Sequence, residues 1–250
     1  MLEELVSQAF WLGLLKIIGV NIILSGDNAV VIALAARSLP AKQQKQAVIW
    51  GSLAAIVMRV ILTIFAVALL SLPWLKLVGS LLLFWIGVKL LIPEDDDDNI
   101  QASDQLLAAI KTILIADLVM SLDNVIAVAA AAGGSYLLLI LGLAISIPLV
   151  IFGATLLLKL MERFPVIITI GAGLIGWVAG EMLVADQALR GWFSGMGIEY
   201  RGEVPYVAGV SLELIAGIVG IVFVVALGKW LGARQEARAA DAEATQPPKS

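Results

Sequence analysis

The chain contains no cysteine and no histidine, and only 14% of its 250 residues are charged. Without these two residue types it can form no disulfide, no thiolate metal site and no imidazole proton relay. Metal ligation or proton transfer must therefore use carboxylates and other oxygen donors. The scarcity of charge, together with 61% hydrophobic residues and a mean hydropathy of +1.01, also excludes a soluble domain with a water-facing surface. The composition predicts a polytopic membrane protein.

Seven apolar runs are long enough to cross about 30 Å of hydrocarbon. The predicted spans are residues 9–36, 47–72, 74–92, 106–132, 136–160, 166–185 and 206–231. Glu3 and Glu4 precede the first run, where a cleaved signal peptide has basic residues, so we expect that run to be the first span. The predicted fold class is all-α, with a single transmembrane domain over residues 1–231. The tail, residues 232–250, has the composition of a frayed helix followed by disorder.

The distribution of lysine and arginine between alternate loops predicts the orientation, because cytoplasmic loops carry the excess. Placing the N-terminus outside leaves only Lys76, Arg190 and Arg201 in outer loops. The loop and tail residues then expected inside are Arg37, Lys42, Lys45, Lys89, Lys111, Lys159, Arg163, Lys229, Arg234, Arg238 and Lys249. We expect an N-out, C-in arrangement in the inner (plasma) membrane.

Two of the predicted spans carry the same polar motif, Ser-x-Asp-Asn. The first reads NIILSGDNAVVIALAA over residues 21–36, and the second reads DLVMSLDNVIAVAAAA over residues 117–132. One offset of 96 residues pairs Asn21 with Asp117, Asp27 with Asp123 and Asn28 with Asn124. An ionised aspartate near the centre of a membrane helix costs roughly 2.5–3.5 kcal/mol, so such residues usually face a bundle interior, a partner or an ion. The motifs therefore indicate a functional site.

The repeat extends beyond these motifs. Residues 73–94 match residues 165–186 at an offset of 92, whereas the middle helices match poorly. Because each unit holds three spans, an odd number, the second unit enters the membrane from the opposite side, as in the inverted repeats of secondary transporters. We predict a 3+3 inverted repeat with units at about 9–92 and 106–185, and a seventh helix at about 206–231 outside it.

The motif aspartates fall near the middle of their spans, where inverted-repeat transporters bind their substrates. We therefore expect the carboxylates of Asp27 and Asp123 to share one cation. Gly26, Ser25 and the side-chain amides could loosen the helix and expose carbonyl oxygens as further ligands. For Asn28 and Asn124 taken singly, a role in interhelical hydrogen bonding stays open.

Other polar residues are weaker candidates for the same site. Asn21 and Asp117 lie six residues before each motif aspartate, so a regular helix would turn them to roughly the opposite face. Glu213, in the last span, is a candidate fifth ligand or proton-coupling carboxylate. Arg59, also within a span, is expected to be a salt-bridge partner of a carboxylate. The acidic run of residues 94–98 could concentrate cations at the cytoplasmic entrance, or it could be only a solvated loop.

The segments SGDNAVVIALAAR and SLDNVIAVAAA, the seven spans and the acidic central loop resemble the TerC family of integral membrane proteins. Within it they are similar to the YjbE-type branch, in the broader LysE-like transporter superfamily. The resemblance covers residues 5–231. It implies metal-ion export, chiefly of manganese, with Asp27, Asn28, Asp123 and Asn124 forming the metal path. Because Asn21 stands where the second repeat has Asp117, this site has one carboxylate fewer than a symmetric one.

Oxygen ligands suit Mn²⁺, Mg²⁺ or Ca²⁺ and argue against Cu⁺ or a structural Zn²⁺ site. Carboxylates bind metal when deprotonated and take up protons when desolvated and empty, which favours metal-for-proton exchange. We therefore expect a transporter and not an enzyme, without a prosthetic group or nucleic-acid partner. Its expected partners are the divalent cation, the lipid bilayer, and a second copy or another membrane protein. Two alternatives stay open: a membrane scaffold that delivers metal to secreted partners, and an exporter of a small organic solute.

Overall fold

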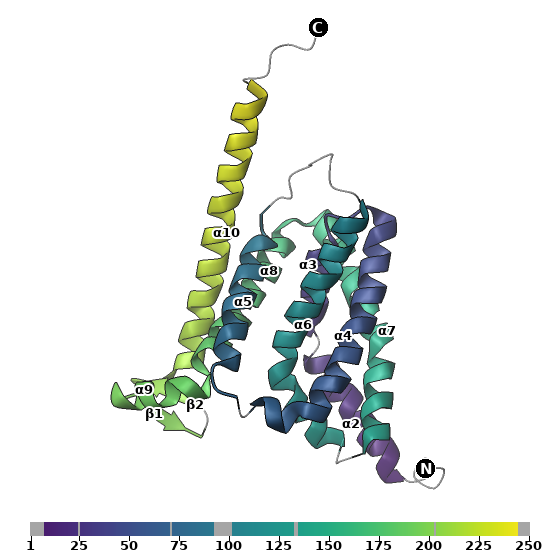
Figure 1. The fold of residues 1–250 in the computed structure, drawn as a ribbon, viewed down its shortest axis with the longest axis vertical. Coiled ribbons are helices and arrows are strands. Elements are labelled where there is room, and N and C mark those ends of the chain that lie inside the picture. Colours follow the sequence, from purple (N-terminus) through teal and green to yellow (C-terminus); the bar gives the residue numbers. More distant parts are fainter. Residues whose placement is uncertain are drawn as a thin grey trace.

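The computed structural model describes residues 8–24, 26–70, 72–92, 102–132, 135–202 and 204–244. They form a bundle of long helices that lie side by side (Figure 1). The bundle helices are α2 (Gln8–Leu24), α3 (Gly26–Ala36), α4 (Ala41–Leu70), α5 (Leu75–Lys89), α6 (Ala102–Ala132), α7 (Tyr136–Arg163), α8 (Val166–Val184) and α10 (Leu212–Ala244). Helices α4 to α8 lie where the sequence predicts spans, with ends that differ by up to six residues.

The outer surface of the bundle is apolar. Trp85, Phe152 and Val222 each expose more than half of their side chains, which would be unfavourable for a monomer in water. Within the described residues, five helices are long and apolar enough to cross a membrane. They comprise Ala41–Phe65, Ser103–Leu122, Leu137–Arg163, Val166–Val184 and Leu212–Arg238. The chain is therefore a multi-pass integral membrane protein.

The first predicted span is not one helix. α2 ends at Leu24 and α3 begins at Gly26, within the predicted span of residues 9–36 and at the point where the sequence was expected to loosen the helix. Gly26 is a poor helix former, and Asp27 and Asn28 beside it favour caps and turns over helix interiors. A break at this point leaves the last carbonyl groups of α2 and the first N–H groups of α3 without intrahelical partners. The second motif behaves differently, because α6 continues through it without interruption.

The nearly all-helical structure agrees with the all-α prediction, and a small folded insertion with three short strands separates α8 from α10. It contains a 3-10 turn (Gln187–Leu189), the short helix α9 (Arg190–Gly195), and an antiparallel sheet of β1 (Glu199–Arg201), β2 (Val204–Val207) and β3 (Val210–Ser211) in the order β1-β2-β3. Ala208 and Gly209 both have positive φ (49° and 83°), as a two-residue type I′ hairpin turn requires. Burial raises the pKa of Tyr200 in β1, whose ring lies under Arg190.

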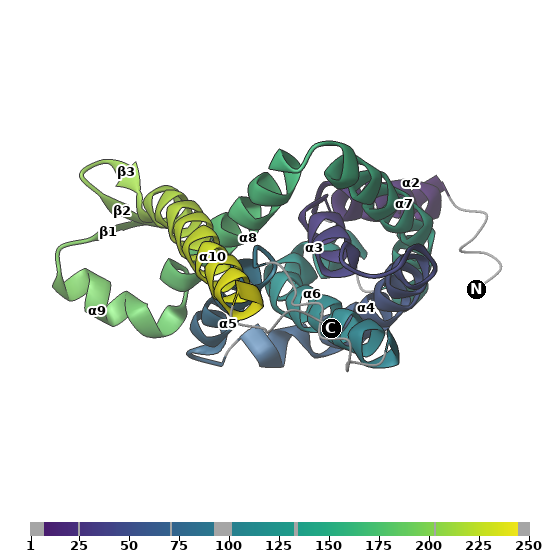
Figure 2. The same ribbon diagram turned by 90° about the horizontal axis from the view of Figure 1, so that it is seen from above.

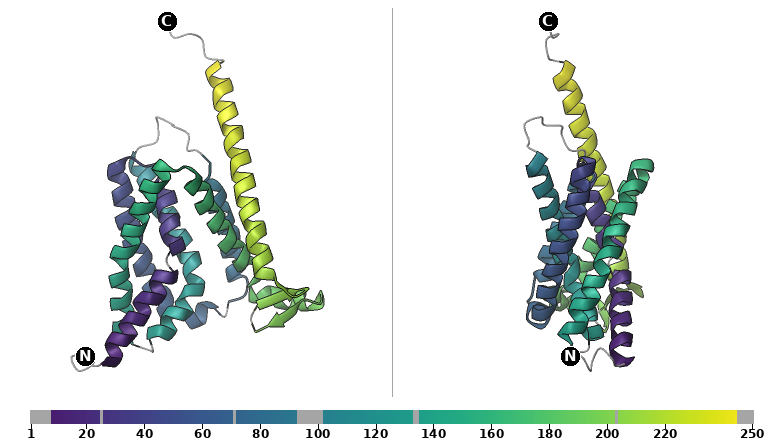
Figure 3. Two further views of the ribbon diagram at one scale, coloured as in Figure 1. Left: turned by 180° about the vertical axis from the view of Figure 1, so that it is seen from behind. Right: turned by 90° about the vertical axis from the view of Figure 1, so that its right-hand side faces the viewer.

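Helix α10 begins and ends later than predicted. The predicted seventh span starts at residue 206, which is part of β2, and ends at 231, whereas α10 runs from Leu212 to Ala244. Its C-terminal part therefore extends beyond the rest of the bundle (Figure 3). Residues 245–250, also part of the predicted tail, lie outside the described residues. α10 packs on α8 and α5, on the side of the bundle away from α4 and α7 (Figure 2).

The two halves of the bundle pack in the same way. α2 and α3 pack on α7, just as α6 packs on α4, and α5 and α8 pack on each other. In Figure 1 the chain rises along α3 and descends along α6, so these helices run in opposite directions. Two glycines permit matching close approaches, because a Cβ on Gly51 would meet Ile113, and one on Gly142 would meet Ile17. The contact between α4 and α6 thus has a counterpart between α7 and α2.

Candidate functional site

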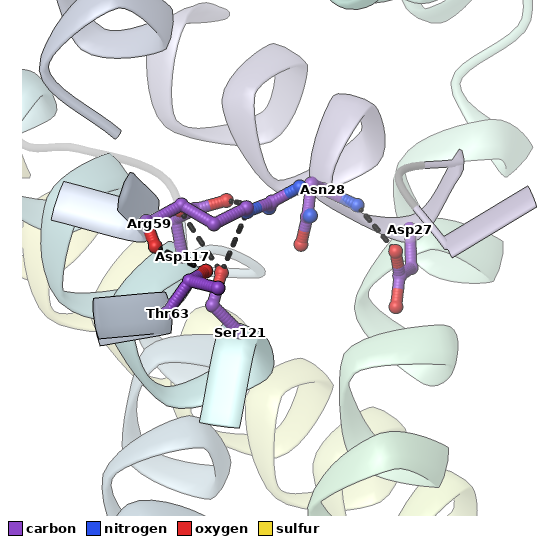
Figure 4. A network of polar contacts seen from close by, with 6 residues as sticks. All are labelled: Asp27, Asn28, Arg59, Thr63, Asp117 and Ser121. Carbon is purple, nitrogen blue, oxygen red and sulfur yellow. Dashed lines mark hydrogen bonds and ion pairs between the residues drawn. The ribbon is translucent and has the colours of Figure 1, made fainter. Parts of the chain in front are cut away.

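A buried ionic cluster joins α4 to α6 in the middle of the bundle (Figure 4). The Arg59 Nη2 group donates to Asp117 Oδ1 at 2.6 Å, and the Arg59 Nε group donates to Ser121 Oγ at 3.0 Å. Ser121 Oγ in turn donates to Asp117 Oδ2 at 3.2 Å. Arg59 is 3% exposed and Asp117 is 5% exposed. The predicted salt-bridge role of Arg59 is therefore confirmed, and both carboxylate oxygens of Asp117 are engaged.

Helical spacing explains how this cluster forms. Asp117 and Ser121 lie four residues apart, and so on the same face of α6. Arg59 lies within α4, where its backbone carbonyl also accepts a hydrogen bond from the Thr63 hydroxyl at 2.7 Å. Because these helices offer apolar neighbours almost everywhere else, the guanidinium and the carboxylate satisfy each other, as buried charges must.

A small polar cavity adjoins the cluster. It is lined by Asn28, Ser52, Arg59 and Asp117, with apolar neighbours, and its volume is about 10 Å³, close to the space that one water molecule or small ion needs. Asn28 is 3% exposed and Ser52 is 1% exposed. Within the described residues, neither the amide of Asn28 nor the hydroxyl of Ser52 has a hydrogen-bond partner. Buried polar atoms of this kind usually bind water, an ion or a ligand.

Asp27 lies next to this cavity but is not part of the ionic cluster. It is half-buried in the first turn of α3, and its Oδ1 atom accepts the N–H of Asn28 at 2.8 Å. Figure 4 shows Asn28 between Asp27 and the Arg59 side chain. The first turn of a helix favours a carboxylate, because free N–H groups and the positive end of the helix dipole lie there. The helix break thus holds one carboxylate beside the cavity.

The structure leaves several predicted site residues untested. The side chains of Asn21 and Asp123 and the acidic run 94–98 lie outside the described residues. Asn124 is half-buried on α6, which packs against α3. Glu213 lies in the first turn of α10, next to β3, and α10 packs on α8 and α5. Asn28 and Asp117 therefore come together, whereas Glu213 belongs to another part of the bundle.

The described residues give an oxygen-rich site, not a cluster of carboxylates. Among them, no group of three or more Asp, Glu, His or Cys side chains could hold a metal ion. The side-chain oxygens that line the cavity are those of Asn28, Ser52 and Asp117, whereas the Asp27 carboxylate does not line it and lies beyond Asn28 as seen from Arg59 (Figure 4). Ser52 and Ser121 were not predicted as site residues. Ser121 belongs to the Ser-x-Asp-Asn motif, and that motif is the sequence feature that could have identified it as a site residue.

These features define a multi-pass helical membrane protein with a polar site inside its bundle. The chain belongs to the TerC family, because residues 6–236 match the model described as "Integral membrane protein TerC family". This confirms the resemblance noted from the motifs. The chain is 47% identical over 180 residues to the uncharacterized membrane protein YjbE of Bacillus subtilis (strain 168), an alignment that covers 72% of this chain and 83% of YjbE.

Two further membrane proteins of the same organism are more distant relatives. YkoY is 25% identical over 198 residues, covering 71% of this chain and 61% of YkoY. YceF is 29% identical over 174 residues, covering 64% of this chain and 66% of YceF. No solved structure matches the chain at a significant level.

Proposed function

We propose that this protein is a transporter of the inner (plasma) membrane that exports a divalent cation, with Mn²⁺ as its main substrate. The observation that carries the proposal is the cavity beside the helix break. Leaving a buried polar group unsatisfied costs about 1–3 kcal/mol, and both Asn28 and Ser52 carry this cost within the described residues. A cation that enters the cavity would be bound by oxygens of Asn28 and Ser52, and Asp27, the residue before Asn28, would add a negative charge nearby. Oxygen ligands of this kind suit Mn²⁺, Mg²⁺ and Ca²⁺.

The proposed architecture is a 3+3 inverted repeat with a seventh span, oriented N-out and C-in. Its units are α2 to α5 and α6 to α8, with α2 and α3 together forming one span. The opposite directions of α3 and α6 support it. The matching contacts of Gly51 with Ile113 and of Gly142 with Ile17 support it as well. Transporters of this plan bind substrate at the repeat interface, on interrupted helices, and the α2/α3 break lies beside the cavity.

Proton coupling is the natural driving mechanism for such a site. A carboxylate must be deprotonated to bind a metal ion. When the ion leaves, the charged carboxylate is disfavoured in an apolar bundle, and uptake of a proton removes the charge. We propose that Asp27 and Asp123 alternate between cation and protons, so that proton entry drives cation export.

The two alternative functions differ in their support. A metal-delivering scaffold would use the same oxygens but would move no net cation across the membrane. An exporter of organic solutes needs more space, because sites for such molecules usually span about 300–1,000 Å³. The polar cavity has a volume of only about 10 Å³, and the larger pockets, of about 570 and 620 Å³, are lined mostly by apolar residues of α5, α8 and α10 and offer few polar groups to a solute. The main choice therefore lies between a transporter and a scaffold.

A flux assay on inverted membrane vesicles decides between them. Vesicles that contain the protein should accumulate Mn²⁺ when a pH gradient, acidic inside, is imposed, and Asp27→Asn should reduce the rate by more than about ten-fold because a negative charge near the cation is lost. Asp104→Asn is the matched control, since Asp104 is exposed in the first turn of α6 and its loss should leave the rate unchanged. Equal Mn²⁺ uptake in wild type and Asp27→Asn, at equal protein levels, would rule out the transport site.

A further inference from the structure

The structure shows which residues of the two middle helices, α4 and α7, correspond to each other in the proposed repeat. The sequence repeat leaves this correspondence undefined. Ile17 and Ile113 are separated by the 96-residue offset of the two motifs. Since Ile113 fits against Gly51 and Ile17 fits against Gly142, these glycines are equivalent positions of α4 and α7. The middle helices therefore correspond at an offset of 91 residues.

This register identifies the counterpart of Arg59. At an offset of 91 it is Val150, and Arg59 and Val150 both line the polar cavity. The counterpart of Asp117, at an offset of 96, is Asn21. The first repeat thus has Arg59 where the second has Val150. The second repeat has Asp117 where the first has Asn21. The positive and the negative residue that break the symmetry bind each other at 2.6 Å.

We propose that Arg59 and Asp117 form a self-compensating pair of charges, so that together they add no net charge to the cation site beside them. This inference rests on the proposed function, and it makes Asp117 a partner of Arg59 instead of a metal ligand. Arg59 is a positioning residue, because it cancels the charge of Asp117 and so keeps that carboxylate from adding to the charge of the cation site.

The geometry around Asp117 supports this assignment. Its Oδ1 atom is taken by Arg59 and its Oδ2 atom by Ser121, while Ser121 also accepts from Arg59 Nε. A cation that bound Oδ1 would compete with the buried guanidinium, and one that bound Oδ2 would compete with the Ser121 hydroxyl and lie close to the positive charge of Arg59, which opposes its binding. Asn28 and Ser52, which have no partner among the described residues, face the same cavity and have oxygens to offer without such a cost.

A double-mutant cycle on the purified full chain tests the pair. Arg59→Gln adds an uncompensated negative charge beside the site and should tighten Mn²⁺ binding by about ten-fold, whereas Asp117→Asn leaves a positive charge and should weaken it by about ten-fold. The double variant restores the balance, so its Mn²⁺ affinity should lie within about three-fold of wild type and its unfolding temperature above those of both single variants. Titration calorimetry and tryptophan fluorescence measure the two quantities.

Two results would overturn the inference. One is a folded double variant that binds Mn²⁺ more weakly than wild type by about ten-fold or more, as expected if Asp117 were a ligand. The other is a double variant whose unfolding temperature falls by the sum of the decreases measured for the two single variants. If the first double variant does not fold, Arg59→Val/Asp117→Asn, which copies the counterpart residues, replaces it, and failure of both to fold also overturns the pair. Absence of Mn²⁺ binding to wild type would count against the proposed function, while the unfolding temperatures would still decide on the pair.

Discussion

At the scale of single residues, two kinds of buried polar side chain lie side by side. Arg59, Asp117 and Ser121 bind one another, whereas Asn28 and Ser52 have no partners within the described part of the chain. Unpartnered groups cost stability, so a fold selected for stability alone would have apolar residues at these two positions. Their presence therefore points to a bound water, ion or ligand, and a ligand at this place would give the site a measurable trade-off between stability and binding.

Ser52→Ala should raise the stability of the empty protein and weaken its cation binding at the same time. Loss of an unsatisfied hydroxyl should stabilise by about 1 kcal/mol, or roughly 2–4 °C in Tm for a chain of this size. Loss of a ligand oxygen should weaken Mn²⁺ binding by about ten-fold or more. Scanning fluorimetry without metal and a Mn²⁺ titration measure the two effects.

Ser146→Ala is the matched control for this change. Ser146 is also 1% exposed, but its hydroxyl donates to the carbonyl oxygen of Gly142 at 2.9 Å. Its removal should leave Tm unchanged or lower, and Mn²⁺ binding unchanged. If Ser52→Ala binds Mn²⁺ as wild type does, Ser52 is not a ligand.

The sequence predicted part of this site for clear physical reasons. Charged and amide groups inside apolar runs are expensive, so Asp27, Asn28 and Asp117 stood out, and Arg59 was expected to pair with a carboxylate. Ser52 could not be recognised, because a serine in a membrane helix usually bonds to its own backbone, as Ser146 does. Only the packed structure shows that the hydroxyl of Ser52 lacks such a bond.

At the scale of helices, close backbone contact fixes α10 to the bundle. A Cβ on Gly176 would meet the backbone carbonyl of Gly220, and one on Gly180 would meet that of Ala216. Small residues at such crossings let membrane helices approach closely, where van der Waals packing holds them together. α10 is thus attached through α8, and the proposed repeat does not include it.

Gly180→Ala should therefore destabilise the protein without changing the cation site. The added methyl group would collide with the backbone of α10 and force the helices apart, which costs about 1–3 kcal/mol, or roughly 2–10 °C in Tm. Gly19→Ala, whose Cβ would meet nothing within 4 Å, should leave Tm unchanged or raise it. Thermal unfolding tests both, and a Tm for Gly180→Ala equal to wild type would contradict the close contact.

The elements that sequence reasoning missed share one cause: hydropathy averages over many residues. The run of residues 9–36 stays apolar across the Ser-Gly-Asp-Asn segment, so its average hydropathy does not separate α2 from α3, and only Gly26 and its polar neighbours indicated a loosened helix there. The three strands before α10 are only two to four residues long, which is too short for an alternating pattern to be recognised. Long helices such as α4 and α7 were predicted because a whole span contributes to each average.

At the scale of the whole molecule, the proposed repeat was predicted from the sequences of its outer helices only. The motif helices and the third helices keep enough identical residues to align, whereas the middle helices differ at most positions, including the exchange of Arg59 for Val150. Their correspondence became visible through the glycine contacts between packed helices. The proposed correspondence of α4 with α7 therefore rests on packing contacts and not on side-chain identity.

The proposed topology can be tested by labelling single cysteines, because the chain has none of its own. Ser38, between α3 and α4, and Ala237, near the end of α10, are exposed and lie six proposed spans apart, so both should face the cytoplasm. Ser194, exposed on α9, should face outward. In intact cells a membrane-impermeant maleimide should label Ser194→Cys, and it should label Ser38→Cys and Ala237→Cys only after permeabilisation.

Labelling of Ser38→Cys and Ala237→Cys from opposite sides would contradict the span count. The exact reverse of the expected pattern would preserve the span count but place the acidic run outside, and export would then lose the cytoplasmic entrance it requires.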